Sequence, residues 1–401
     1  MAEIDWDRLR AVVGEHVAAG EVPGVVMAAS DGGDVRVETV GGARPADEDG
    51  TGAPLAADAV VRIASMTKAL TGALTLALVE EGALAVGDRV DRWIPELADR
   101  RVLRRIDGPP QDTVPANRPI TVDDLLTLRM GFGFVTDSAC PVMDLAAQGE
   151  LGIGPPDPSV PLTPDAWIAR FAQLPLMKQP GADWMYDLAY GVLGIVLARA
   201  AGRPLDELMR DRLLGPLGMD DTGFAVPEHA RDRLIPAYAR DDEGRLVEYD
   251  VAGSGAAGPS KWAERPSFPD ARGGLVSTIS DYLRFARMLL AGGIANDGTR
   301  VLSGDSVAAL TSDQLGPAQP RSANARVFLG DDGWGYGVGV MTPESDSGAS
   351  TPRYGWGGGF GTTWYSFPER DLAVVMATQV FPPQGAVINA FWSALRAMIG
   401  A

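Results

Sequence analysis

Residues 61–70 read Val-Arg-Ile-Ala-Ser-Met-Thr-Lys-Ala-Leu and place Ser65 three positions before Lys68, where a helix begins. Positions i and i+3 share a helix face, so the hydroxyl and the amine can meet. The N–H groups at a helix N-terminus stabilise negative charge that develops on such a hydroxyl. The stretch predicts a serine nucleophile assisted by a lysine, although a serine N-cap followed by a solvated lysine also fits it. Only two other lysines, Lys178 and Lys261, occur in the chain, which makes this lysine informative.

Two later stretches combine aromatic residues with glycines. Residues 180–194 read Pro-Gly-Ala-Asp-Trp-Met-Tyr-Asp-Leu-Ala-Tyr-Gly-Val-Leu-Gly, and residues 354–362 read Tyr-Gly-Trp-Gly-Gly-Gly-Phe-Gly-Thr. Taken alone, Tyr186 beside Trp184 is typical of a core, and the glycine run is typical of a tight hairpin with close strand approach.

The composition excludes several classes of protein. With 35 Lys+Arg against 53 Asp+Glu, the net charge of −18 argues against binding to nucleic acid or to an anionic membrane. The only histidines and cysteine, His16, His229 and Cys140, are too few for the common metal sites, so we expect neither metal nor cofactor. No G-x-S-x-G is present, and neither histidine lies at a strand end or in a glycine-rich turn, which argues against the α/β-hydrolase triad. Without a secretory leader or a long apolar run, the expected location is cytoplasmic.

Strand patterns lie near both ends of the chain, with helical patterns between them. The strand-like runs are residues 24–29, 35–40, 334–341, 362–367 and 372–378. The sequence therefore predicts an α/β (α+β) fold, in which one antiparallel sheet is flanked by N- and C-terminal helices. Residues 1–86 and 255–401 are expected to form this discontinuous sheet domain. Residues 87–254 form a mostly helical insertion, with the active site at the interface.

The serine–lysine pair and the two aromatic stretches resemble the serine β-lactamase and penicillin-binding-protein superfamily. They are most similar to its esterase branch, the family VIII carboxylesterases, which are similar to class C β-lactamases. Residues 216–222 and 273–278 also match, so the resemblance runs through most of the chain.

This resemblance implies roles for single residues. Ser65 is the nucleophile that becomes acylated, Lys68 helps to deprotonate it, and Tyr186 acts as general base and then protonates the leaving group. The backbone N–H groups of Ser65 and Gly359 form the oxyanion hole. The expected pocket residues are Trp356, Gly357, Gly358, Phe132, Trp184 and Phe360, although each aromatic one taken singly is also a core candidate.

Three departures from the family pattern bear on the substrate. Lactamases usually carry asparagine where this chain has Leu188, and lysine where it has Trp356. Residues 128–131, Leu-Arg-Met-Gly, replace the His-Thr-Ser-Gly found in relatives. A penicillin or D-Ala-D-Ala substrate therefore fits poorly, and an uncharged, apolar ester or thioester fits better.

The expected activity is ester hydrolysis through a covalent acyl-enzyme, with a small-molecule ester or acyl donor as partner. An acyltransferase of the same branch is the first alternative. A β-lactamase, a D-amino-acid peptidase and a non-catalytic binding protein are further ones. The sequence does not indicate the oligomeric state.

Overall fold

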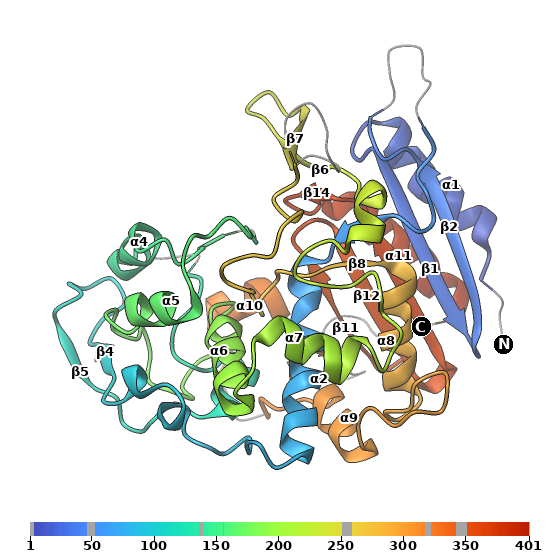
Figure 1. Ribbon diagram of the computed structural model, residues 1–401. Helices are drawn as coiled ribbons and strands as arrows, with labels where there is room; N and C mark the ends of the chain where they lie inside the picture. The colour runs from blue at the N-terminus through green and yellow to red at the C-terminus, as the bar shows by residue number, and fades with distance from the viewer. Residues whose placement is uncertain are drawn as a thin grey trace.

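The two ends of the chain meet in one antiparallel sheet, where N-terminal strands pair with C-terminal ones (Figure 1). The computed structural model describes residues 4–45, 53–135, 139–154, 156–250, 259–316, 322–341 and 351–400. In these residues the sheet has seven strands, in the order β2 (Asp34–Gly41), β1 (Gly24–Asp31), β13 (Leu372–Ala377), β12 (Thr362–Phe367), β11 (Arg353–Gly358), β10 (Gly339–Met341) and β9 (Gly333–Trp334).

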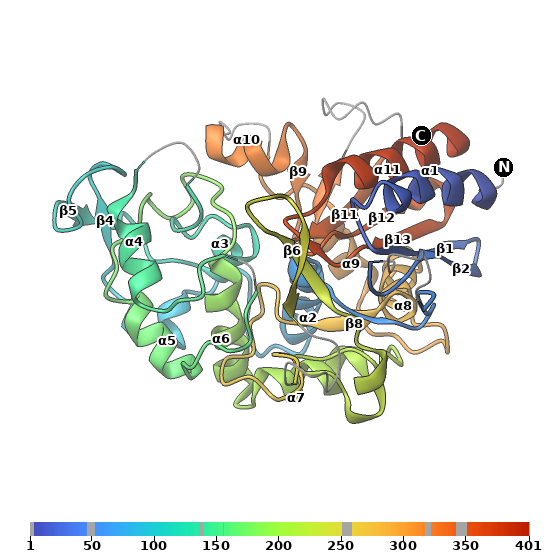
Figure 2. The ribbon, with the colours of Figure 1, turned by 90° about the horizontal axis from the view of Figure 1, so that it is seen from above.

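Both faces of this sheet are covered by helices (Figure 2). Side chains alternate between the faces of a strand, and β1 follows this rule with apolar residues on both sides. Val25 and Met27 pack with α1 (Trp6–Ala18) and α11 (Gly385–Ile399), whereas Val26 belongs to the cluster that contains α8 (Ile279–Leu290). Both faces of β1 are therefore buried, whereas β2 at the edge of the sheet is largely exposed.

The helix α2 (Thr67–Glu80) stands between the sheet and the helical part, as Figure 1 shows. It is almost entirely buried, which explains why its sequence is mostly apolar, with the buried polar exceptions Thr67, Lys68, Thr71 and Thr75. The chain reaches α2 from β3 (Val60–Arg62) through a 3₁₀ turn, η1 (Ala64–Met66). β3 pairs with β8 (Val276–Thr278), so the start of α2 is anchored to a second short sheet.

The remaining elements lie mostly in the region predicted to be helical. Its helices are α3 (Val122–Leu126), α4 (Pro141–Gln148), α5 (Pro164–Phe171), α6 (Ala189–Ala201), α7 (Leu205–Met209) and the π-helix η4 (Arg210–Leu214). Its short 3₁₀ helices are η2 (Val90–Arg92), η3 (Pro95–Leu97) and η5 (Glu228–Arg233). The later part of the chain adds α9 (Gly304–Thr311), α10 (Ala323–Leu329) and the 3₁₀ turn η6 (Pro368–Arg370).

The predicted antiparallel sheet with its flanking helices is confirmed, and the middle of the chain differs from the prediction in one respect. It also contains strands: β4 (Arg101–Leu103) pairs with β5 (Thr113–Pro115), and β6 (Ala237–Arg240) pairs with β7 (Leu246–Asp250). β6 also pairs with β14 (Val380–Phe381), so the end of the middle region is tied to the C-terminal part. The boundary at 86/87 remains a prediction, and the one at 254/255 lies outside the described residues.

Candidate active site

Ser65 lies in η1, and the α-helix that was predicted to begin near Ser65 begins at Thr67 instead. Ala64 before it has a φ of 45°, a left-handed conformation that residues other than glycine rarely adopt. Such a turn is held only where the surroundings fix it. Here Tyr282 of α8 donates a hydrogen bond to the carbonyl oxygen of Met66, at 3.0 Å. Ser65 is half-buried, whereas both neighbours in the chain are buried.

Lys68 is fully buried and points back at Ser65. Its Nζ lies 3.1 Å from the Ser65 Oγ, 2.5 Å from Oδ1 of Asp187 and 2.8 Å from the carbonyl oxygen of Arg272. Burial alone lowers the pKa of Lys68, but the charges of Asp187 and Tyr186 outweigh it and raise this pKa above its ordinary value. Because Lys68 is fully buried, it is not the solvated surface lysine of the alternative interpretation.

Tyr186 comes from the loop before α6 and lies beside the same lysine. The Lys68 Nζ is 4.5 Å from the centroid of the Tyr186 ring. Trp356 of β11 donates a hydrogen bond from its Nε1 to the Tyr186 hydroxyl oxygen, at 2.8 Å. The ring of Phe328 stacks on that of Tyr186 with centroids 4.6 Å apart. These contacts fix the ring, and the Trp356 donor stabilises negative charge on the phenol oxygen.

The strand β11 runs directly against the segment before Ser65, and its glycines allow this approach. A Cβ on Gly358 would lie 2.3 Å from the carbonyl oxygen of Ile63, which is too close for any side chain. Thr362 reinforces the contact, since its Oγ1 donates to the same Ile63 oxygen at 3.1 Å. The glycine run is thus part of a strand that lies beside Ser65, and Gly359 lines the same cavity as Ser65.

Ser65 opens into a cavity of about 480 Å³ whose wall is mostly apolar and aromatic. The aromatic residues that line it are Phe134, Tyr186, Phe328, Trp356, Tyr365 and Phe381. Its charged residues are Asp187, Asp270 and Arg272. This volume accommodates a small organic molecule, and the aromatic wall favours an apolar one.

A family model described as Beta-lactamase matches residues 9–397. The chain belongs to the beta-lactamase family. Esterase EstB of Burkholderia gladioli, a relative in this family, is 30% identical over 92% of this chain and 89% of its own length. Protein Rv1367c of Mycobacterium tuberculosis is 39% identical over 82% of this chain and 80% of its own.

A solved structure has the same fold. It is "EstCE1, a hydrolase with promiscuous acyltransferase activity", which superimposes with a TM-score of 0.77 at 22% identity, over 97% of this chain and 98% of that one. The resemblance to the esterase branch of the beta-lactamase family and the predicted fold are therefore confirmed.

The structure brings most of the predicted site residues together. Ser65, Tyr186, Trp356, Gly357, Gly358 and Gly359 line the cavity, and Lys68 lies behind Ser65. The structure does not bring the other predicted pocket residues to the cavity wall. Phe132 packs edge-on against Phe171, Trp184 stacks behind Tyr186, and Phe360 packs against Trp262, all of them buried in the core. These aromatic side chains pack in the core. The sequence alone does not distinguish an aromatic residue of the core from one that lines a pocket.

Asp187 and Arg272 are site residues that sequence analysis missed. Asp187 directly follows the motif tyrosine, and Arg272 directly precedes the matching stretch 273–278, so motif proximity was the available signal. The Arg272 guanidinium bonds to Asp270 at 2.7 Å and lies 3.7 Å from Asp187. Burial lowers the pKa of Arg272, but these two carboxylates raise it above its ordinary value.

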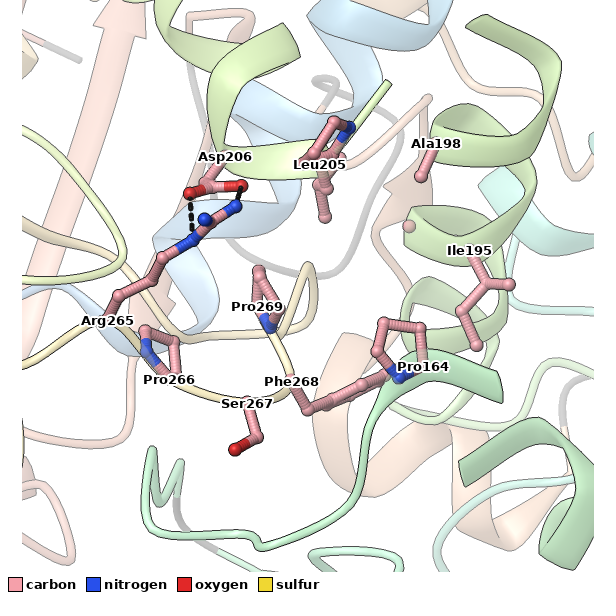
Figure 3. Close-up of a pocket in the computed structure, with 12 residues that line it drawn as sticks. Pro164, Ile195, Ala198, Leu205, Asp206, Arg265, Pro266, Ser267, Phe268 and Pro269 are labelled. Carbon is pink, nitrogen blue, oxygen red and sulfur yellow. Dashed lines mark hydrogen bonds and ion pairs between the residues drawn. The ribbon is translucent and has the colours of Figure 1, made fainter. Parts of the chain in front are cut away.

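A second cavity, of about 440 Å³, lies between α6, the start of α7 and the loop 265–269 (Figure 3). Figure 3 shows the one ion pair at its rim, between Arg265 and Asp206, with apolar side chains such as Ile195 and Leu205 around the rest. Ser267 lines it, but no lysine does. This cavity therefore lacks the arrangement found around Ser65.

Among the described residues, no group of three or more His, Cys, Asp or Glu side chains is placed to hold a metal ion. No helix in those ranges is long and apolar enough to cross a membrane.

Proposed function

We propose that this protein is a serine ester hydrolase that works through a covalent acyl-enzyme on Ser65. The observation that carries the proposal is the contact of 3.1 Å between the buried Lys68 Nζ and the Ser65 Oγ, at the wall of an apolar cavity. The relationship to Esterase EstB over nearly the whole chain supports the same activity. The partner we propose is a small-molecule ester.

In the first half-reaction, the Ser65 Oγ attacks the ester carbonyl carbon while its proton passes to the phenolate oxygen of Tyr186. The carbonyl π electrons move onto oxygen, and the N–H groups of Ser65 and Gly359 are proposed to bind this oxyanion. The intermediate then collapses, the bond to the alcohol oxygen breaks, and Tyr186 returns its proton to that oxygen. Acyl-Ser65 and free alcohol result.

The second half-reaction repeats these steps with water as nucleophile. Water attacks the acyl carbon, Tyr186 takes its proton and returns it to the Ser65 Oγ as the carboxylic acid leaves. An alcohol or amine in place of water gives acyl transfer with the same residues. Acyl transfer is therefore the second activity to test.

The charge arrangement supports an uncharged, apolar ester as substrate. Asp187 and Asp270 are paired with Lys68 and Arg272, so the charges in the cavity wall compensate one another. At the position where lactamases carry a lysine, this chain presents the indole of Trp356. A substrate carboxylate would have no free cation among the described residues that line the cavity.

The test is intact-protein mass spectrometry with p-nitrophenyl acetate and p-nitrophenyl octanoate, with nitrophenol release followed in parallel. Wild type is expected to show a burst and an acyl adduct, and Ser65→Ala neither. Ser267→Ala, in the second cavity, is the matched control and should behave as wild type. Turnover that survives Ser65→Ala would refute the proposal. Added alcohols or amines then measure how the acyl group partitions between water and another acceptor.

A further inference from the structure

We propose that Asp187 is a positioning residue that keeps Lys68 as an ammonium ion, so that Lys68 donates a hydrogen bond to Ser65 and Tyr186 alone receives the serine proton. This inference rests on the proposed function, because it assigns the proton acceptor of that reaction. It concerns a carboxylate that directly follows the motif tyrosine.

The hydrogen bonds of Lys68 restrict its protonation state. The Asp187 Oδ1 at 2.5 Å and the Arg272 carbonyl oxygen at 2.8 Å can only accept, so each takes one N–H from Lys68. The third neighbour, the Ser65 Oγ at 3.1 Å, fits either the third N–H of an ammonium or the lone pair of a neutral amine. The charge of Asp187 decides between the two, because a carboxylate at this distance favours the charged form.

The charge balance of the buried cluster favours the same state. Lys68 and Arg272 face Asp187 and Asp270, and all four residues are at most 9% exposed. With Lys68 protonated, the two positive charges equal those of the two carboxylates, and the Tyr186 phenolate that the proposed reaction requires adds a further negative charge that favours the ammonium. With Lys68 neutral, one buried negative charge would remain uncompensated, which is strongly unfavourable in a low-dielectric environment.

The other groups around Lys68 do not reverse this conclusion. Tyr186 presents its ring to the ammonium, and Tyr190 of α6 donates its hydroxyl to the Leu126 carbonyl oxygen at 2.9 Å. Arg272 is the only further cation facing Lys68 among the described residues; it lowers the pKa of Lys68, but by less than Asp187 and Tyr186 raise it. The pKa of Lys68 stays above its ordinary value, although burial acts in the opposite direction.

The backbone conformation at Asp187 indicates that a side chain is required at this position. Its φ is 149°, which is unfavourable for a residue with a Cβ. Glycine would adopt this conformation without strain. The site instead carries a residue whose carboxylate reaches Lys68. Asparagine keeps the shape of aspartate and removes only the charge, so Asp187→Asn is the informative substitution.

The rarity of lysine makes a direct measurement feasible. In protein grown with ¹³Cε/¹⁵Nζ-lysine, NMR should show one signal each for Lys68, Lys178 and Lys261, and Lys178→Arg and Lys261→Arg assign them. In wild type, the Lys68 signal should remain that of an ammonium to above pH 10. In Asp187→Asn its titration midpoint should fall by at least about one pH unit. Asp281→Asn, a buried carboxylate of α8 bonded to Arg284, is the matched control and should leave it unchanged.

Kinetics supply a second readout. If the reaction needs the ammonium form, the alkaline limb of kcat/KM against pH should move to lower pH in Asp187→Asn. We also expect a fall in kcat of at least about 10-fold with little change in KM, since the carboxylate acts on the nucleophile rather than on substrate binding. A purely structural role would change stability without moving the alkaline limb.

The possible results separate this inference from the proposed function. A wild-type Lys68 that is neutral at pH 8 overturns the inference even if Asp187→Asn does not fold. A folded Asp187→Asn with unchanged Lys68 midpoint and alkaline limb also overturns it, while the Ser65 acyl adduct would still support the esterase. Absence of any adduct in wild type refutes the esterase, and the NMR titration still decides the state of Lys68.

Discussion

Two buried clusters of opposite charges flank Ser65 along the chain, and only one of them borders the cavity. Three residues before Ser65, Arg62 donates from Nε to Asp250 at 3.0 Å and from Nη1 to the Ile235 carbonyl oxygen at 2.7 Å. Three residues after it, Lys68 bonds to Asp187. Both cations have an exposed fraction of 0%.

The difference lies in what each cluster holds. Arg62 ties β3 to β7 and to the segment just before β6, and it does not line the cavity around Ser65. Lys68 contacts the hydroxyl of Ser65, and its ion-pair partner Asp187 lines the cavity. A buried ion pair of a cation and a carboxylate therefore does not by itself indicate a catalytic role. Contact with Ser65 and with its cavity distinguishes the proposed catalytic cluster, that of Lys68, from the structural one, that of Arg62.

The largest effect is expected from breaking the Lys68 cluster at its centre. Lys68→Met should lower kcat by at least about 10³-fold, because the Ser65 Oγ loses the charged neighbour that favours its deprotonation. The measurement is the steady-state hydrolysis of p-nitrophenyl acetate, with circular dichroism to verify the fold. The exposed Lys178→Met is the control with unchanged turnover. A Lys68→Met enzyme that keeps a tenth of its activity would place this lysine outside the reaction.

Breaking the Arg62 cluster should affect stability instead. Arg62→Met leaves the Asp250 carboxylate buried without its partner, which should lower the free energy of unfolding by about 3–5 kcal/mol. Urea unfolding followed by tryptophan fluorescence measures this loss. The kcat per folded molecule should change by less than about threefold, since Arg62 does not touch the cavity. A large fall in kcat at unchanged stability would mean that the two clusters act as one.

A smaller effect is expected at Trp356, whose indole donates a hydrogen bond to Tyr186, the proposed base. Trp356→Phe keeps an aromatic ring but removes the donor to the Tyr186 hydroxyl oxygen, so kcat should fall by about 10-fold. Trp334→Phe is a suitable control, because its Nε1 donates to the Leu126 carbonyl oxygen and its ring packs on that of Trp356 at 4.8 Å. Equal losses in the two variants would attribute the effect to packing alone.

The smallest effect concerns the wall of the cavity rather than its charges. Phe328→Ala removes the ring that stacks on Tyr186 and should raise the kcat/KM ratio of octanoate to acetate esters by about threefold. The measurement is competition between the two p-nitrophenyl esters in one assay. Val327, its neighbour in α10, is 63% exposed, and Val327→Ala should leave the ratio unchanged.

The sequence predicted which residues lie together around Lys68 better than it predicted how their charges are paired. Ser65, Lys68 and Tyr186 were identified because their motifs have fixed spacing and order. Asp187 and Arg272 were not, since a single carboxylate and a single guanidinium carry no local pattern, and their pairing depends on loops distant in sequence. The strand pattern likewise predicted β12 and β13, whereas β6 and β7 went unpredicted because β7 is largely exposed and lacks a run of buried apolar residues.

The sheet that supports the site has a consequence for how the protein is made. Val26 of β1 pairs with Ala377 of β13, and Phe381 of the following segment lines the cavity around Ser65. During synthesis on the ribosome, β1 can pair with β2, but its other edge, which is apolar, stays unpaired until β13 has emerged. Open apolar strand edges invite association with other chains. Nascent chains of this enzyme should therefore need chaperone protection until translation is nearly finished, and an acyl-enzyme should form only after that point.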